Sequence, residues 1–295
     1  MTELPSLETL LPLIARLNAS METLAALAVH LDPHGDRPHE SIASTVSSVV
    51  ALAGVPEGVS AEERAIAVGL VRAFFRQAAD LLERPDRAPG WSHDDPAVLE
   101  SQGRASGLLA RLFHMLPEEL PLRRALARDG ARFLDVGTGV GWLAIGMARA
   151  FPSLEVVGVD RSERALSLAR ENLRASNLEA RVELRAADAT SMEDPCPFDV
   201  VWLPGPFLDA SALARCAERA HAMLAADGWV VVGTYGEEDA LAAALADLRT
   251  IRSGGTPWTG PGLASALEAA GFADAEEIPK RWPAPVRMVA GRKAR

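Results

Sequence analysis

The sequence has few cysteines and no excess of basic residues. Its two cysteines, Cys196 and Cys216, fit neither the spacing of a zinc site nor a disulfide framework. We therefore expect no metal site and a reducing, cytoplasmic environment. Aspartate and glutamate outnumber lysine and arginine by 40 to 30, which gives a net charge of −10. This charge disfavours DNA or RNA as a partner, because nucleic acid is strongly acidic.

Long uncharged runs and a basic amino-terminal segment are also missing. The longest uncharged stretch, Ser41 to Pro56, is too short to cross a bilayer and contains Gly54. Glu3 and Glu8 occur where a secretory signal peptide would carry basic residues. We therefore expect a soluble intracellular protein without membrane contact. A chain of 295 residues is long enough for one large domain or two modest ones.

Residues 1–128 predict helices and no strand. Apolar residues recur at helical spacing in four stripes, over residues 7–17, 24–31, 42–50 and 66–82. Ser60 and Glu63 form a capping-box pattern before the last stripe. We expect an all-helical amino-terminal domain, 1–128, that packs as a bundle. Four amphipathic helices have more apolar surface than one thin layer can bury, so we also expect this domain to contribute to a homodimer.

Residues 91–116 predict a connector between the two halves of the chain. Asp95 and Pro96 indicate a helix start, and the helix then contains Gly103 and Gly107. Glycine is a poor helix former, but glycines four residues apart let the backbone of another segment approach the helix closely. We expect this approach to be made to another helix, with a ligand as the less favoured alternative.

From Asp129 onward short apolar runs alternate with helical patterns, which predicts an α/β sheet over residues 129–295. The predicted strands cover residues 131–136, 155–160, 181–186, 198–203, 229–234, 272–278 and 286–290. Successive helices between parallel strands are typical of a doubly wound, Rossmann-like sheet.

A glycine-rich turn follows the first predicted strand. Asp135 precedes glycines at positions 137, 139 and 141, and a helical pattern follows. Such a turn presents backbone N–H groups and the positive end of a helix to a ligand. A dinucleotide-binding fingerprint would need a third glycine at position 142, which is Trp142. The alternating glycines therefore disfavour a nicotinamide-dinucleotide site without excluding it.

Acidic residues lie at the carboxyl ends of three successive predicted strands: Asp135 and Asp160 near or at the end of the first two, and Asp188 just after the third. In an open parallel sheet, ligands bind beyond the carboxyl ends of the strands. The Asp160 carboxylate has two acceptor oxygens, which suits the vicinal hydroxyls of a ribose. Asp188 could accept a hydrogen bond from the exocyclic amine of a base. Together with the glycine turn, the three acids indicate a nucleoside-binding site.

These motifs resemble those of the class I S-adenosylmethionine (SAM) methyltransferases over residues 129–295. The resemblance implies a seven-stranded sheet with one antiparallel strand, and SAM as cofactor. It also implies that residues 1–128 form a cap or lid like those of bacterial small-molecule methyltransferases. The implied SAM contacts are Asp135, Gly137 and Gly139 around the methionine part, Asp160 at the ribose, Asp188 and Ala189 at the adenine, and Leu203 beside the methionyl group.

The expected reaction is methyl transfer to an oxygen atom of a small-molecule acceptor. The turn after the fourth strand, residues 204–207, lacks the Asn or Asp that holds a planar amine in enzymes methylating adenine or glutamine. The candidate acceptor-site residues are Trp91, His93, Trp142 and Phe207. His93 is the candidate base, while the aromatic residues could form flat apolar walls.

Two alternatives to a methyltransferase remain open from the sequence. The first is an oxidoreductase that uses NAD(P). The second is a non-catalytic SAM-binding or interaction protein whose helical half does the work. Binding of the cofactor and turnover of SAM separate the three hypotheses.

Overall fold

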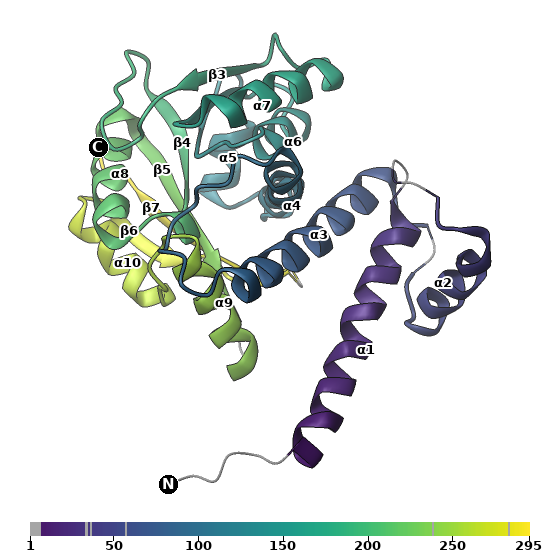
Figure 1. The fold of residues 1–295 in the computed structure, drawn as a ribbon. Helices are drawn as coiled ribbons and strands as arrows, with labels where there is room; N and C mark the ends of the chain where they lie inside the picture. The colour runs from purple at the N-terminus through teal and green to yellow at the C-terminus, as the bar shows by residue number, and fades with distance from the viewer. Residues whose placement is uncertain (1–6, 33–34, 36, 57, 238, 283) are drawn as a thin grey trace, which may run out of the picture. The chain divides into compact units, whose positions relative to one another are not determined.

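The structure is a computed structural model of the chain, in which two compact units can be distinguished, residues 1–80 and 81–295. It describes residues 7–32, 35, 37–56, 58–237, 239–282 and 284–295 (Figure 1). The first unit is helical, and the second contains the sheet together with its covering helices.

The first unit contains three helices in its described part: α1 (Leu7–Leu31), α2 (Glu40–Leu52) and most of α3 (Ala61–Glu83). The expectation of separate helices at 7–17 and 24–31 is wrong, because α1 continues through both stripes. The sequence between the stripes lacks glycine and proline, so nothing there ends the helix. The capping box before α3 is confirmed: the Ser60 N–H donates to Glu63 Oε2 at 2.9 Å, and the Glu63 N–H donates to Ser60 Oγ at 3.3 Å.

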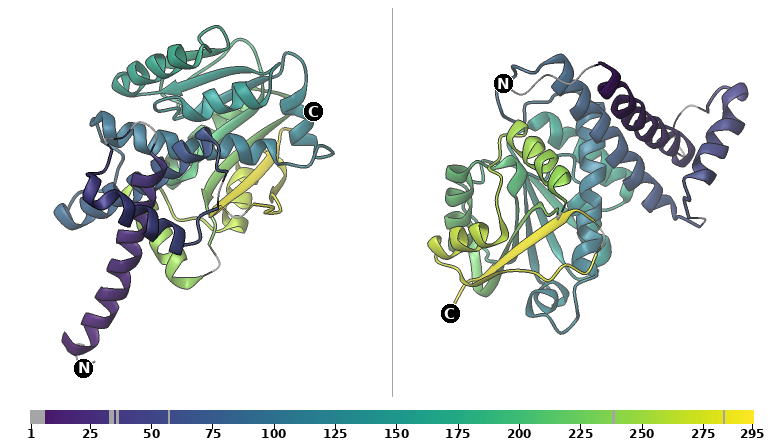
Figure 2. Two further views of the ribbon diagram at one scale, coloured as in Figure 1. Left: turned by 90° about the vertical axis from the view of Figure 1, so that its right-hand side faces the viewer. Right: turned by 90° about the horizontal axis from the view of Figure 1, so that it is seen from below.

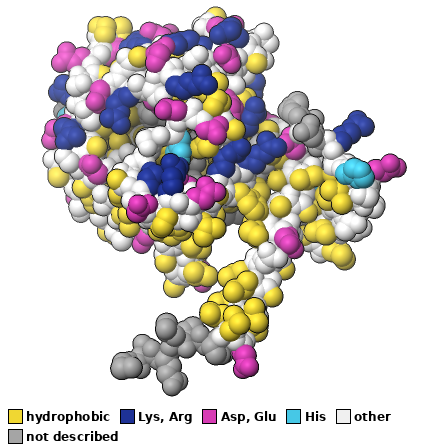
Figure 3. All heavy atoms as spheres, viewed as in Figure 1, with side chains coloured by type: hydrophobic (Ala, Val, Ile, Leu, Met, Phe, Trp, Pro, Cys, Tyr) yellow, Lys and Arg dark blue, Asp and Glu magenta, His cyan; other side chains and the backbone are white. Residues whose placement is uncertain are grey.

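Apolar side chains are exposed along α1. Leu11, Ile14 and Leu17 are 53, 55 and 53% exposed, and hydrophobic atoms line this helix in the space-filling view (Figure 3). Residues Leu10–Leu31 are long and apolar enough to cross a membrane by length and composition alone. This is weak evidence for a membrane span, because a signal sequence near an amino terminus has the same length and composition. The apolar surface of α1 is therefore available for an additional contact.

Seven strands form one sheet in the described part of the second unit. They are β1 (Arg132–Val136), β2 (Glu155–Asp160), β3 (Val182–Ala186), β4 (Phe198–Pro204), β5 (Leu224–Tyr235), β6 (Ala273–Glu277) and β7 (Val286–Arg292). Their order is β3-β2-β1-β4-β5-β7-β6. The pairs from β3 to β5 are parallel, whereas β7 runs antiparallel to both β5 and β6. The seven-stranded, Rossmann-like sheet with one antiparallel strand is thus confirmed.

Helices cover both faces of this sheet (Figures 1 and 2). They are α4 (Pro96–His114), α5 (Pro121–Ala127), α6 (Trp142–Ala150), α7 (Glu163–Ser176), α8 (Ala210–Met223), α9 (Ala240–Arg252) and α10 (Gly260–Ala269), with a short 3-10 helix η1 (Gly205–Phe207). Side chains of α4, α5 and α6 form one core against the sheet, and side chains of α8 and α10 form the other. The central strands are buried on both sides, which explains their nearly continuous apolar sequences.

Helix α4 packs against α6, so the compact sheet unit begins at Leu81 rather than at the expected boundary after residue 128. A methyl group added at Gly146 would lie 2.6 Å from the Cβ atom of Ala110. One added at Gly103 would lie 2.1 Å from Cγ2 of Val140. Small residues therefore allow α4 and α6 to approach closely, as the favoured interpretation of Gly103 predicted. Whether residues 1–128 act together as a cap stays a prediction.

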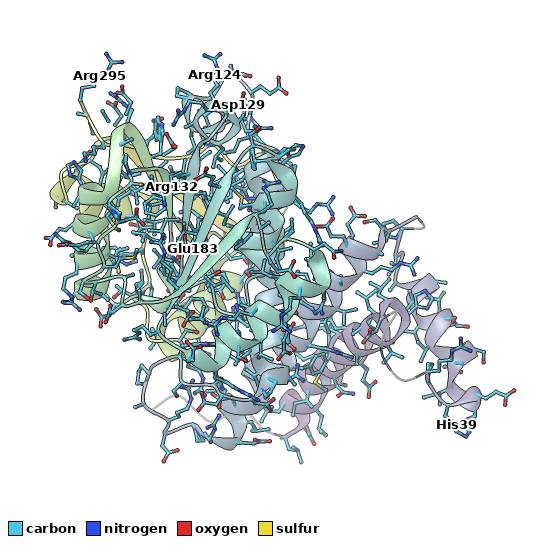
Figure 4. All side chains as sticks on the ribbon, turned by 90° about the horizontal axis from the view of Figure 1, so that it is seen from above. His39, Arg124, Asp129, Arg132, Glu183 and Arg295 are labelled. Atoms are coloured by element: carbon cyan, nitrogen blue, oxygen red, sulfur yellow. The ribbon has the colours of Figure 1, made fainter. Side chains whose placement is uncertain are left out.

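A buried carboxylate fixes the loop between β3 and β4. The Asp194 side chain is 1% exposed and forms ion pairs with Arg132 of β1 and Arg185 of β3. Arg185 also pairs with Glu183, which is labelled with Arg132 in Figure 4. Desolvation opposes the charged form of Asp194, but hydrogen bonds from Arg185, the Cys196 N–H and Arg132 outweigh it and lower its pKa. The network thus joins two strand ends to the loop that follows Asp188.

Candidate functional site

The glycine turn, residues 137–141, lies directly after β1. Gly137, Gly139 and Gly141 have φ values of 67°, 56° and 85°, a region that residues with a Cβ atom rarely adopt. A methyl group added at Gly139 would have the Gly137 carbonyl oxygen as its nearest neighbour, 3.9 Å away. The turn therefore exposes backbone at Gly139 to a ligand, and Gly141 immediately precedes the amino end of α6.

Asp160 lies at the end of β2 and contacts the glycine turn. Its Oδ2 atom accepts a hydrogen bond from the Gly139 N–H at 2.9 Å, and Oδ1 accepts one from the Ser162 N–H at 2.8 Å. Each oxygen of a carboxylate can accept more than one hydrogen bond. The side chain is thus oriented by the backbone and can still accept hydrogen bonds from two neighbouring hydroxyls of a ligand.

Asp135, the acid before the glycine turn, is almost fully buried, with 1% of its surface exposed. Its Oδ2 atom accepts a hydrogen bond from the Thr138 hydroxyl at 2.7 Å. Burial raises the pKa of Asp135 to about 7; the Thr138 hydrogen bond opposes this shift, and the negative charge of Asp160 adds to it. The Asp160 carboxylate, joined by Asp135 when that group is ionised, favours a positively charged ligand over an anionic one.

We expect Asp135 to make the protein less stable as the pH rises from about 4 to about 7. A carboxyl group with a raised pKa keeps its proton longer in the folded state, so its stabilising contribution is complete at low pH and is lost as the pH rises through the folded-state pKa. A shift of this size corresponds to about 4 kcal/mol. Urea unfolding at several pH values should show that Asp135→Asn gains stability relative to the parent between pH 4 and 7. If the difference in unfolding free energy between Asp135→Asn and the parent stayed constant from pH 4 to 7, the raised pKa of Asp135 would be contradicted.

Asp188 and Ala189 lie beyond the end of β3. The Ala187 N–H donates to the Asp160 carbonyl at 3.0 Å, which holds this loop beside β2. Asp188 Oδ1 accepts hydrogen bonds from the Thr190 hydroxyl at 2.7 Å and the Thr190 N–H at 2.9 Å, and these lower the pKa of Asp188. Ala189 packs on the core beneath α8. The three acids singled out in the sequence therefore lie at the carboxyl ends of three neighbouring strands, with Asp135 and Asp160 inside β1 and β2 and Asp188 after β3.

The end of β4 adjoins the glycine turn through Pro204, whose Cγ atom would lie 3.2 Å from a methyl group added at Gly137. Leu203, the preceding residue, is fully buried in the core on the α8 side. A contact between Leu203 and a ligand would therefore have to involve its backbone. The sequence pattern could not distinguish side-chain from backbone contact, because the whole strand is apolar.

Three of the four predicted acceptor-site residues form an aromatic cluster: Trp91, His93 and Phe207. The ring centroids of Trp91 and His93 are 4.7 Å apart, and those of Trp91 and Phe207 are 5.2 Å apart, both in edge-to-face orientation. Phe207 belongs to η1, directly after β4. The cluster therefore lies beyond the carboxyl end of the strand that adjoins the glycine turn.

Trp142 is in a different environment from the aromatic cluster. Its indole N–H donates to Glu100 Oε2 at 3.1 Å, and the guanidinium of Arg104 lies 4.4 Å from its ring centre. Both partners belong to α4, which the sequence placed near the site without assigning these contacts. A tryptophan with its N–H and its ring face occupied is better suited to holding α4 than to contacting an acceptor.

The sequence analysis missed the residues that hold the aromatic cluster in position. Arg87 donates to the carbonyl oxygens of Gly90 at 2.7 Å and Arg252 at 3.1 Å, and the Gly90 N–H donates to the same Arg252 carbonyl at 3.1 Å. A methyl group added at Gly255 would lie 2.4 Å from the Pro206 carbonyl oxygen. The segments around residues 90, 206 and 254 are therefore packed together. The consecutive glycines 254 and 255 were the available signal of this approach.

Comparison with known proteins supports the interpretation of the turn and the sheet. Residues 127–264 match the family model of a methyltransferase domain. The probable cobalt-precorrin-6B C(15)-methyltransferase (decarboxylating) of Thermoplasma volcanium is 37% identical over 87 residues, which are 29% of this chain and 43% of that protein. The chain therefore spans less than half the length of this curated relative.

Solved structures share the fold over nearly the whole chain. The S-adenosylmethionine-dependent methyltransferase SibL has a TM-score of 0.66 at 22% identity, covering 98% of this chain and 100% of that chain. The mitomycin 7-O-methyltransferase MmcR has a TM-score of 0.61 at 20% identity, covering 97% of this chain and 98% of that chain. The strand order and the glycine turn agree with this match: residues 127–264 match a methyltransferase domain, and the chain shares the fold of SAM-dependent methyltransferases.

Proposed function

We propose that the protein binds SAM at the glycine turn and transfers its methyl group to a small molecule. The observation that carries this proposal is the Asp160 carboxylate, which is fixed by the Gly139 N–H at the edge of a methyltransferase sheet. The nearby Asp135 adds to the negative potential there when it loses its proton. A site with the Asp160 carboxylate, and with Asp135 as a second negative charge when it is ionised, suits a sulfonium cofactor better than the pyrophosphate of NAD(P).

In the proposed complex, Asp160 accepts hydrogen bonds from the ribose hydroxyls, and Gly137 and Gly139 border the methionine part. Asp188 and Ala189 contact the adenine, and the negative environment of Asp135 favours the cationic end of the cofactor. Bound SAM would supply a methyl group on a positively charged sulfur. The chain's contribution is then to align an acceptor lone pair opposite the sulfur and to exclude water, and such positioning can contribute roughly 7–11 kcal/mol.

The proposed acceptor is small, partly apolar and methylated on oxygen. Trp91 and Phe207 present ring surfaces beyond the end of β4, and residues 204–207 contain no amide or acid to hold an amine. The structural relative MmcR is a mitomycin 7-O-methyltransferase. Transfer forms an oxygen–carbon bond, breaks the carbon–sulfur bond and releases the hydroxyl proton. We propose His93, which packs on Trp91, as the base that accepts this proton.

Isotopically labelled SAM offers a direct test of the proposed reaction. The protein is incubated with methyl-labelled SAM and a metabolite extract, and small-molecule products are separated and counted. Label in a small molecule supports the proposal, and the product's chemistry identifies the acceptor atom. Binding of SAM with no transfer to any fraction would favour the non-catalytic alternative instead.

We expect His93→Gln to lower kcat about a hundredfold for a hydroxyl acceptor found in this way, because proton transfer to a positioned base contributes roughly 10²-fold or more. Binding of SAM, measured by calorimetry, should change little. The matched control is Asp94→Asn, which alters an exposed neighbouring residue. Equal rates for His93→Gln and the parent between pH 6 and 9 would exclude His93 as the base.

We also propose that the amino-terminal helices contribute to a homodimer. The exposed side chains of Ile14 and Leu17 on α1 support this proposal. Replacing both by glutamate should shift the protein from dimer to monomer in light scattering, whereas Arg16→Glu should not. A parent protein that is strictly monomeric at high concentration would refute the proposal, and association with detergent or lipid instead would favour a membrane contact by α1.

A further inference from the structure

A single carboxylate on α4 connects three helices beside the glycine turn. Glu100 Oε1 accepts a hydrogen bond from the Asn172 side-chain amide of α7 at 2.7 Å, and Oε2 accepts one from the Trp142 indole of α6 at 3.1 Å. Arg104 lies one helical turn further along α4, with its Nε atom 3.6 Å from Oε2. The Glu100 side chain is 25% exposed, so water replaces these partners poorly.

These contacts reach the glycine turn through Asn172. The same Asn172 amide nitrogen donates to the Val140 carbonyl at 3.0 Å. Val140 is 1% exposed and lies between Gly139 and Gly141. The peptide group between Val140 and Gly141 is therefore held by the Asn172 amide, which Glu100 orients in turn.

The chemistry of the contacts requires a carboxylate at position 100. Both neighbours, the indole and the amide, are donors, and a carboxylate offers an acceptor oxygen to each. A glutamine would accept from one donor and direct its own N–H₂ group at the other. In a partly buried site, a donor without an acceptor lowers stability, and packing contacts do not compensate for this loss.

We infer that Glu100 is a positioning residue for the SAM site: it orients Asn172, which fixes the Val140 carbonyl and thereby the peptide between Val140 and Gly141 in the glycine turn. This inference rests on the proposed function, since the turn is taken to border the cofactor. In this inference Glu100 acts through its protein partners Asn172 and Trp142. Its loss should therefore weaken SAM binding while leaving the chemistry of the bound complex nearly unchanged.

The test compares Glu100→Gln with Glu119→Gln, a matched change at an exposed glutamate. We expect Glu100→Gln to raise the Kd for SAM and the KM for SAM about tenfold, and kcat at saturating SAM to change less than twofold. The Trp142 indole N–H resonance, assigned with Trp142→Phe, should move in Glu100→Gln. Glu119→Gln should leave the affinity and this resonance unchanged.

A second variant protects the test against simple misfolding. Asn172→Leu removes the same connection from the α7 side, and its effect on SAM affinity should not add to that of Glu100→Gln in the double variant. Additive losses, or an unchanged Kd in a folded Glu100→Gln protein, would overturn the inference. If the parent itself does not bind SAM, the proposed function fails rather than the role of Glu100.

Discussion

Replacing Asp160 by alanine is expected to weaken SAM binding at least a hundredfold. The carboxylate is held by the N–H groups of Gly139 and Ser162 in a position to accept both ribose hydroxyls. A hydrogen bond to a charged group contributes about 1.5–3 kcal/mol, so losing two costs about 3 kcal/mol or more. The Gly139 N–H also loses its partner, which loosens the glycine turn. Calorimetric titration with SAM measures the change directly.

Two further variants make the Asp160 result specific. Asp86→Ala removes an exposed acid outside the candidate site and should leave the Kd unchanged. Asp188→Ala should raise the Kd for SAM less than Asp160→Ala does, because Asp188 Oδ1 already accepts hydrogen bonds from the N–H and hydroxyl of Thr190 in its own loop. A Kd for Asp160→Ala within threefold of the parent would mean that Asp160 does not hold the ribose.

The second large effect is expected from a single methyl group at Gly103. In an exposed helix, replacing glycine by alanine raises the free energy of unfolding by about 1 kcal/mol. Here the new Cβ atom would lie 2.1 Å from Cγ2 of Val140 and 3.2 Å from Cδ1 of Trp142. Val140 is buried in the glycine turn and cannot move without disturbing the turn. We therefore expect Gly103→Ala to lower the free energy of unfolding by about 2 kcal/mol and to weaken SAM binding.

Urea unfolding and calorimetry of Gly103→Ala and Gly103→Val test this expectation. Valine should be more damaging than alanine, because it adds two further methyl groups at the same contact. Stabilisation by alanine, the normal result in a helix, would show that α4 does not press on the glycine turn. Equal SAM affinity in both folded variants would separate the packing of α4 from the function of the turn.

The sheet was predictable because its strands are buried and local in sequence. The predicted strand at 155–160 coincides with β2, and the strand at 198–203 differs from β4 by one residue. The start of β5 was predicted five residues late, since Asp227-Gly228 is typical of a turn. In the structure Asp227 adopts a φ of 63°, and residues 227 and 228 pair with Lys293, far away in sequence.

The arrangement of the helices was less predictable. An apolar stripe indicates that a helix is buried on one side, but not which partner covers it. Helix α4 has the same kind of stripe as a bundle helix, yet it packs on α6 through Gly146 and Ala110. The sequence therefore predicted the helix and the close approach at Gly103, but not the division of the chain between Asp80 and Leu81.

The candidate site was predicted where a residue type itself indicates the chemistry. The strand-end acids and the glycines met this condition, and their geometry matches the pattern used to select them. Trp142 was selected as a possible wall for the acceptor, whereas its ring and N–H contact Arg104 and Glu100. Such contacts between distant segments leave no local pattern, and Arg87 was missed for the same reason.

The central claim is that the glycine turn and Asp160 bind SAM, and isothermal calorimetry tests it most directly. The parent protein is titrated in separate experiments with SAM, with its demethylated product S-adenosylhomocysteine, and with NAD and NADP. Our account predicts saturable binding of SAM and S-adenosylhomocysteine at one site per chain, and no heat from either dinucleotide. Tight binding of NAD or NADP without binding of SAM would contradict it.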